Sequence, residues 1–261
     1  MQLHQLIEWL EHLAPLRYQE SYDNSGLLVG EPDQDITGVL VSLDCTEAVV
    51  EEAIASGCNV IVAHHPIIFS GLKKLTGSNY IERTVMKALR NRVAIYAIHT
   101  NLDNIREGVN AKICEKIGLH TLDFLQPKAG EEHAGSGMLA ELAEAMPEAD
   151  FLSHLKESME LPLIRHTELR GKPVKKVAVC GGAGSFLLPK ALEAEADFFI
   201  TADYKYHQFF DAEGKIVIAD IGHYESEVFT KDLLRKRIQR AFDGLPTRLA
   251  ETVTNPVRYF W

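Results

Sequence analysis

The sequence lacks any apolar run long enough to cross a membrane, which takes about 20 consecutive residues in a helix. The opening residues, MQLHQ, also lack the basic start and the apolar stretch of a secretory signal peptide. These two absences predict a cytoplasmic protein that has no contact with a membrane.

Cysteine is scarce, and its four copies are scattered along the chain at Cys45, Cys58, Cys114 and Cys180. No C-x-x-C pair occurs, so neither a thiolate zinc site nor a disulfide framework is expected. Isolated cysteines of this kind behave as small hydrophobic residues in a cytoplasmic protein, and we expect all four to be buried.

An excess of basic residues is missing too. Lys and Arg together number 27 against 37 Asp and Glu, which gives a formal net charge of −10. Tight binding to a phosphate backbone is therefore not expected. An acidic protein can still carry a local basic surface, so nucleic acid stays an alternative partner. The basic cluster at residues 231–240 is predicted to be the solvated face of a helix.

The motifs of serine hydrolases and of nucleotide-binding loops are absent. No G-x-S-x-G elbow occurs, which argues against serine chemistry. The glycine-rich segment at residues 181–184 (GGAG) matches neither G-x-G-x-x-G nor a Walker loop. It is predicted to be a tight strand-to-helix turn, whose backbone N–H groups could still contact an anionic ligand.

What the chain does contain is an alternation of apolar strands and helices. Strands are predicted at residues 38–44, 59–63 and 93–98, and a helix is predicted after each of them. This β-α-β-α-β-α order predicts a mainly parallel sheet with right-handed crossovers.

A second lobe repeats this pattern with strands at residues 176–180, 197–201 and 215–220. An offset of 138 residues places Val41 on Val179 and keeps the elements in the same order. We therefore predict an α/β protein made of two pseudo-repeated α/β lobes, with mainly parallel or mixed sheets flanked by helices.

Residues 126–172 interrupt the pattern, because they contain several glycines and only one helix and one short strand are predicted there. We interpret them as a segment that bridges the two lobes. The expected domains are residues 1–125 for the first lobe, 126–172 for the bridge and 173–261 for the second lobe.

Two adjacent histidines, His64 and His65, follow the strand at residues 59–63 and precede Pro66, which cannot continue a ladder. In open α/β sheets, ligands bind at this carboxyl end of the strands. Neighbouring side chains on an extended chain point in opposite directions, so each imidazole could reach a different metal ion, or one could ligate while the other holds it. The alternative is a pair of hydrogen-bonded loop histidines.

Two further polar clusters follow predicted strands, and each contains a histidine and a carboxylate four residues apart. On a helix this spacing puts both side chains on one face, where they can chelate one ion or bridge two. The candidate metal ligands from the three clusters are His64, His65, Asp103, His223 and Glu227.

This donor set offers nitrogen and oxygen atoms and no thiolate, which suits Fe, Zn, Mn, Ni or Co better than Ca or Cu(I). Five side chains exceed the needs of one tetrahedral ion, so we predict two divalent metal ions per chain, about 3.5–4 Å apart. Ions held in this way lower the pKa of a bound water, and the predicted chemistry is hydrolysis of a small-molecule substrate. No individual catalytic residue is assigned.

Four more polar residues are candidates for holding the second nitrogen of a ligand or for contacting substrate: Asn24, His99, Asp203 and His207. Asn24 lies in a polar loop, for which a plain connector is the alternative. For His207, the spacing favours a histidine on a helix surface.

Five motifs lie in order along nearly the whole chain: SYDNSGLLVG at residues 21–30, AHHP at 63–66, HTNLD at 99–103, TAD at 201–203 with His207, and GHYESE at 222–227. Together they resemble the motifs of the GTP cyclohydrolase I type 2 homologues, also called the NIF-three-like family. The resemblance implies a dinuclear metal centre in the cleft between two similar lobes, and it places the ligands on the same five residues. Ala202 is a departure, because the family usually has Gly before this Asp.

The resemblance also implies a homohexamer, built as a trimer of dimers in a toroid, in the short form of the family that lacks an inserted domain. The family name implies a nucleotide substrate and hydrolytic opening of the imidazole ring of GTP, with release of formate. Two alternatives stay open: a metal-dependent phosphoesterase, and a non-catalytic metal-binding ring protein that binds nucleic acid or a regulatory partner.

Overall fold

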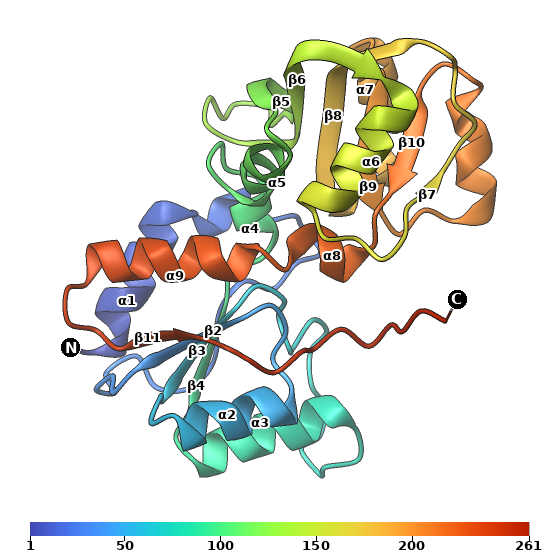
Figure 1. The fold of residues 1–261 in the computed structure, drawn as a ribbon. Coiled ribbons are helices and arrows are strands. Elements are labelled where there is room, and N and C mark those ends of the chain that lie inside the picture. The colour runs from blue at the N-terminus through green and yellow to red at the C-terminus, as the bar shows by residue number, and fades with distance from the viewer. Residues whose placement is uncertain (261) are drawn as a thin grey trace. The chain divides into compact units, whose positions relative to one another are not determined.

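The computed structural model describes residues 1–260, and the chain forms two compact units. The first unit comprises residues 1–102 with residues 230–258, and the second comprises residues 103–229 with residues 259–260. Each unit has its own sheet with helices on both faces (Figure 1), which confirms the predicted α/β class.

The first unit is built on a five-stranded sheet in the order β1-β4-β3-β2-β11. Its strands are β1 (Gly26–Val29), β2 (Val39–Ser42), β3 (Val60–Ala63), β4 (Ala94–Ala97) and β11 (Thr247–Leu249). The last four run parallel to one another, and β1 pairs antiparallel with β4. Every residue of β2, β3 and β4 is buried, because both faces of a parallel sheet are covered.

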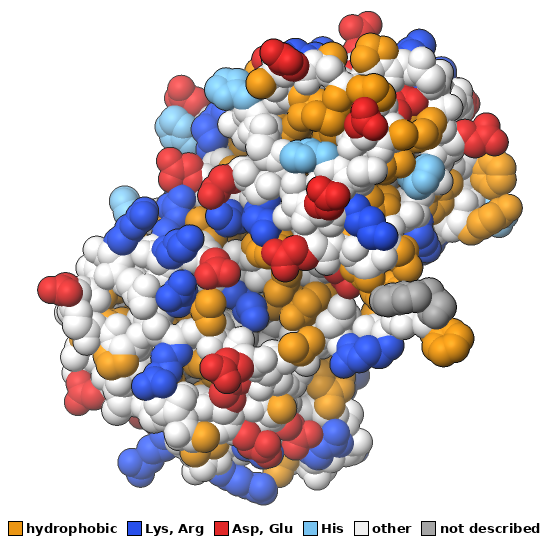
Figure 2. Space-filling view, in the orientation of Figure 1, with side chains coloured by type: hydrophobic (Ala, Val, Ile, Leu, Met, Phe, Trp, Pro, Cys, Tyr) orange, Lys and Arg blue, Asp and Glu red, His pale blue; other side chains and the backbone are white. Residues whose placement is uncertain are grey.

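Helices α2 and α3 cover one face of this sheet, and α1 and α9 cover the other (Figure 1). The helices are α1 (Leu3–Leu13), η1 (Leu16–Tyr18), α2 (Glu47–Ala55), α3 (Tyr80–Arg90) and α9 (Thr230–Ala241). Figure 2 shows Lys and Arg side chains along α9, where Leu234 and Ile238 are buried against the sheet. The basic cluster is thus the outer face of this helix, as expected.

The second unit has a six-stranded sheet in the order β5-β6-β8-β9-β10-β7. Its strands are β5 (His120–Pro127), β6 (Gly135–Pro147), β7 (Arg165–His166), β8 (Pro173–Ala183), β9 (Phe198–Ala202) and β10 (Val217–Asp220). Strands β8, β9 and β10 are parallel, and the outer strands join them antiparallel.

Helices α5 and α6 pack on one face of this sheet, and α7 and η3 pack on the other (Figure 1). The helices are α5 (Val109–Ile117), α6 (Glu148–Ser158), η2 (Ser185–Leu187), α7 (Leu188–Glu193) and η3 (Tyr206–Ala212). Two very short helices, α4 (Thr100–Asp103) and α8 (His223–Glu227), begin within a few residues of the ends of β4 and β10.

The two sheets share a core of the same topology, which confirms the pseudo-repeat. Strands β2, β3 and β4 correspond to β8, β9 and β10, and the antiparallel neighbour β1 corresponds to β7. The register agrees as well, since Val39 pairs with Val60 and Val177 pairs with Phe198, both shifted by the predicted 138 residues.

The bounds of the units differ from the expected domains in three ways. Residues 103–125, expected in the first lobe, belong to the second unit. The chain after α9 returns to the first sheet, where Thr247 of β11 pairs with Val39. Residues 126–172, expected to be a bridge, instead supply β6, which pairs with β5 and β8 inside the second sheet. The glycines that suggested a bridge allow close packing there, because a Cβ at Gly135 would lie 2.7 Å from Cβ of Phe124.

No helix in the described part of the chain is long and apolar enough to cross a membrane. All four cysteines are buried free thiols, as the sequence predicts.

Candidate metal centre

Three histidines of the first unit lie together where β3 and β4 end. His64 and His65 directly follow β3, and His99 comes two residues after β4. Their ring centroids are 4.9–5.4 Å apart, and each ring offers a nitrogen within 4.8 Å of the others. We call these three residues the first donor group, because imidazole nitrogens at this separation can share a metal ion.

Each imidazole of the first donor group is held through Nδ1. The acceptors are the carbonyl oxygen of Ile98 for His64, at 2.8 Å, and carboxylate oxygens for the other two, each at 2.7 Å. Oxygen acceptors require the proton on Nδ1, which leaves the lone pair on Nε2, and this is the usual arrangement of a metal-ligating histidine.

The two carboxylates are Asp44, which accepts from His65, and Asp23, which accepts from His99. Burial alone would raise the pKa of Asp23, but its hydrogen bonds with His99 and Thr100 hold that pKa well below its ordinary value. Asp23 is therefore ionised and keeps the His99 ring in place.

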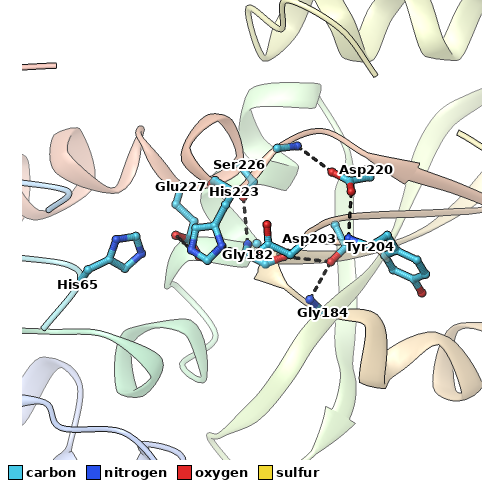
Figure 3. Close-up of polar contacts among 12 residues, drawn as sticks. His65, Gly182, Gly184, Asp203, Tyr204, Asp220, His223, Ser226 and Glu227 are labelled. Carbon is cyan, nitrogen blue, oxygen red and sulfur yellow. Dashed lines mark hydrogen bonds and ion pairs between the residues drawn. The ribbon is translucent and has the colours of Figure 1, made fainter. Parts of the chain in front are cut away.

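The second unit supplies a histidine that lies against two carboxylates (Figure 3). His223 and Glu227, four residues apart on α8, approach to 3.1 Å between Nε2 and Oε2. Nδ1 of His223 lies 2.8 Å from Oδ2 of Asp203, which follows β9. Burial lowers the pKa of His223, but the hydrogen bonds to Asp203 and Glu227 outweigh it and raise the pKa to about 11. Such a negative environment favours a cation, and a divalent metal ion can replace the proton.

Asp103, the last residue of α4, belongs to the same cluster. It offers a carboxylate oxygen within 4.8 Å of one on Glu227. Burial and the charges of these two carboxylates also raise the pKa of the Cys180 thiol. We call Asp103, His223 and Glu227 the second donor group.

A glycine makes room for the second donor group. Gly182 has φ of +62°, and a Cβ there would lie only 2.4 Å from Oε1 of Glu227. Its N–H donates to the Ser226 hydroxyl at 3.0 Å (Figure 3). The glycine-rich segment, in which β8 continues to Ala183, thus packs against α8 and its carboxylate ligand.

The remaining candidates have distinct places in the structure. Asn24 donates from Nδ2 to the carbonyl oxygen of Ile68 at 2.6 Å, and so ties two loops of the first unit together. His207 lies exposed on η3, where its ring contacts those of Tyr206 and Phe210. Neither of them supplies an atom to the donor groups.

Three important residues were missed by the sequence analysis. Asp44 follows the end of β2 and could have been found by the rule that singled out His64 and His65. Thr254 donates from Oγ1 to Oδ2 of Asp44 at 2.5 Å, and nothing in its local sequence indicates this role. Asp23 lies one residue before Asn24 in the polar loop, where the sequence analysis singles out only Asn24.

These observations define a protein with two α/β units, the first with three imidazoles that could hold a metal ion and the second with a histidine that lies against two carboxylates. The family model described as Duf34/NIF3 (NGG1p interacting factor 3) matches residues 1–256, and the chain belongs to this family.

Curated relatives agree with this assignment. A Lactococcus lactis protein is 34% identical over 248 residues, which cover 94% of this chain and 95% of the relative. A Clostridium perfringens protein is 32% identical over 228 residues, which cover 87% of each chain. Both are named GTP cyclohydrolase 1 type 2 homolog, so the predicted resemblance is confirmed.

Solved structures share the fold. A Staphylococcus aureus protein of known crystal structure is 28% identical in sequence to this chain, and its structure superposes with a TM-score of 0.92. The match covers 100% of this chain and 99% of that one. A Bacillus cereus protein related to NIF3 is 24% identical, with a TM-score of 0.90 and the same coverage, and shows likeness of fold alone.

Proposed function

We propose that the protein is a metal-dependent hydrolase that holds two divalent metal ions with its two donor groups and acts on a small molecule such as a nucleotide. The ligands would be His64, His65, Asp103, His223 and Glu227. Their nitrogen and oxygen atoms suit Fe, Zn, Mn, Ni or Co. The name of the curated relatives supports a nucleotide substrate.

The observation that carries this proposal is the common orientation of four imidazoles. The rings of His64, His65, His99 and His223 all have Nδ1 within 2.7–2.8 Å of an oxygen acceptor. All four therefore present Nε2 as the ligand nitrogen. Histidines that served only as hydrogen-bonding loop residues would not need the same nitrogen to be anchored four times.

The bound ions would supply a water of lowered pKa and would stabilise negative charge that develops in the reaction. The chain's own groups would prepare the site for them. Asp44 and Asp203 keep the proton on Nδ1 of His65 and His223. His99, held by Asp23, would serve as a further ligand or would contact substrate.

Metal content tests the ligand assignment. The native protein, purified without chelator, should contain about two ions per chain by elemental analysis. The His65→Ala and Glu227→Ala variants should each contain less. His207→Ala is the matched control, because this exposed histidine supplies no atom to the donor groups. Metal that persists unchanged in both ligand variants would overturn the assignment.

The reaction products and the number of subunits then distinguish the three alternatives: a cyclohydrolase, a phosphoesterase and a non-catalytic ring protein. Release of formate from GTP would support ring opening, whereas release of phosphate would support a phosphoesterase. We also propose the homohexamer that the family resemblance implies, which light scattering tests directly. If Glu227→Ala abolishes turnover and leaves the assembly intact, the metal is catalytic; if it changes only the assembly, the non-catalytic ring protein is the better description.

A further inference from the structure

A row of aromatic rings in the first unit leads from solvent to the first donor group. The rings of Tyr22 and Phe69 have centroids 6.2 Å apart and planes tilted by 41°, and the Phe69 ring lies 6.2 Å from that of His99. The exposed fraction falls along this row, from 62% for Tyr22 to 46% for Phe69 and 15% for the side chain of His99. We call Tyr22 and Phe69 the aromatic pair.

The two loops that carry the aromatic pair are held in place by hydrogen bonds. Asn24 Nδ2 donates to the carbonyl oxygen of Ile68 at 2.6 Å, which joins one loop to the other. Asp23 accepts from Nδ1 of His99 at 2.7 Å, which joins both loops to the donor group. The two rings are therefore preorganised beside His99, so little ordering entropy would be lost when a ligand binds them.

Exposed aromatic rings in this position indicate a binding surface. Single exposed hydrophobic residues are common and need no explanation, but these two rings lie beside each other, and Phe69 adjoins His99, one of three ligand-type histidines. The face of an aromatic ring binds other planar rings by stacking, and it does so with little regard to their substituents.

We propose that the aromatic pair is the stacking surface for a planar heteroaromatic ring of the substrate, so that the substrate class is a base-containing compound such as a nucleotide. The proposal rests on the proposed function for the reaction that this ring undergoes. A ring stacked on Phe69 would lie next to His99, one of the three imidazoles of the first donor group.

Calorimetric titration of the metal-loaded protein with three probes tests this proposal. AMP and GMP carry a base, and ribose 5-phosphate has the same sugar phosphate without one. The native protein should bind both nucleotides about 5- to 150-fold more tightly than ribose 5-phosphate, because stacking on an aromatic side chain contributes about 1–3 kcal/mol per base. Phe69→Ala and Tyr22→Ala should each weaken nucleotide binding and leave ribose 5-phosphate binding unchanged.

Phe69→Leu keeps an apolar side chain without an aromatic face, so it should also weaken nucleotide binding while preserving the loop. Tyr80→Ala is the matched control, because Tyr80 is 57% exposed in the same unit and belongs to α3. Equal binding of the three probes by the native protein would overturn the proposal. The proposal would also be overturned if Phe69→Ala and Tyr22→Ala bind nucleotides as tightly as Tyr80→Ala does. If these variants change only the number of subunits measured by light scattering, the two rings form a contact between subunits instead, and the proposal is again overturned.

The outcome is separate from that of the proposed function. Neither ring is a metal ligand, so the pair variants should retain the native metal content. A native protein that contains metal but does not prefer nucleotides would overturn the stacking surface alone. A native protein that prefers nucleotides but takes up no metal would overturn the metal-dependent reaction and leave the stacking surface in place.

Discussion

The two units contain the same strand core but place different chemistry at its carboxyl end. The predicted offset of 138 residues places His65 of the first unit on Asp203 of the second. His65 is a candidate ligand held by a carboxylate, whereas Asp203 is a carboxylate that holds a candidate ligand, His223. The shared topology therefore provides equivalent positions for polar side chains in the two units. The residue type at each position decides whether its side chain is a metal ligand or anchors one.

The two donor groups differ in charge as a result. The donors of the first are three imidazoles, with Asp23 and Asp44 as anchors behind them, whereas two of the three donors in the second are themselves carboxylates, with Asp203 as the anchor of its imidazole. Negative charge at short range favours a divalent ion strongly when the groups are buried, as Glu227 is with 3% of its side chain exposed. We therefore expect the second donor group to contribute more to metal affinity than the first.

Replacement of Glu227 should have the largest effect. Glu227→Gln keeps the size of the side chain and removes its charge, and it should lower metal affinity by more than about 100-fold, which exceeds the cost of losing an outer hydrogen-bond partner. His65→Ala should have a smaller effect, because it removes a neutral donor. Competition with a chromogenic chelator would measure both, with Glu213→Gln on the exposed surface as the control. A larger loss in His65→Ala would reverse the comparison.

Gly182→Ala should have the next largest effect on metal affinity. It tests whether the second donor group needs a residue without a side chain beside Glu227. The new Cβ would lie 2.4 Å from the Glu227 carboxylate and would displace it. Metal affinity should therefore fall nearly as far as it does in Glu227→Gln. Gly214→Ala is a matched control, since Gly214 has a similar φ of +66° and no atom within 4 Å of the added Cβ. Equal chelator competition by the two variants would show that backbone strain, not displacement, is responsible.

The anchoring carboxylates allow a direct comparison between the units. Asp44→Asn and Asp203→Asn should each lower metal affinity by about 10- to 100-fold, because they loosen a ligating imidazole. Asp44 should matter more, since 33% of its side chain is exposed against 52% for Asp203, and solvent screens it less. The same chelator titration measures both, and an equal loss in the two variants would contradict the role of burial.

Thr254 should have a smaller effect, because it acts on a ligand only through Asp44. Thr254→Val removes the hydroxyl and should lower metal affinity about three- to ten-fold, in line with the loss of one hydrogen bond to a charged group. Thr254→Ser should restore the native affinity in the chelator titration. If the serine variant behaves as the valine variant does, the role of Thr254 is packing.

The smallest effect concerns acid stability at the start of α3, where Glu82 lies in the first turn of the helix. Hydrogen bonds from Thr76 and Ser78 lower the pKa of Glu82 from about 4.5 to about 2. Because this pKa is depressed on folding, the carboxylate stabilises the protein above about pH 4.5, and this contribution is lost as the pH falls through about 2.

Glu82→Gln should therefore lower the thermal midpoint by a few degrees at pH 7, and the difference from the native protein should shrink on acidification. Scanning calorimetry from pH 7 towards pH 2 would measure this. Glu8→Gln, at an exposed position of α1, should show no such pH dependence. A difference that stays constant down to pH 2 would mean that the charge of Glu82 contributes nothing.

The sequence by itself determined the strand core and most of the candidate ligands, because both depend on local pattern. Continuous apolar runs predicted the parallel strands, and β3 ends where His64 begins. The four-residue spacing of His223 and Glu227 predicted their approach, since α8 places them on one face. Such features involve residues that are close in the chain, and short-range geometry decides them.

The tertiary structure alone decided which residues hold the ligands and where the units end. Thr254 reaches Asp44 across 210 residues, and β11 joins β2 after more than 200 residues. Gly182 lies against Glu227 because β8 and α8 pack together, not because of any local motif. These contacts form only when long segments of chain close on one another, and the free energy of that closure depends on the packing of the whole unit, which no local pattern contains.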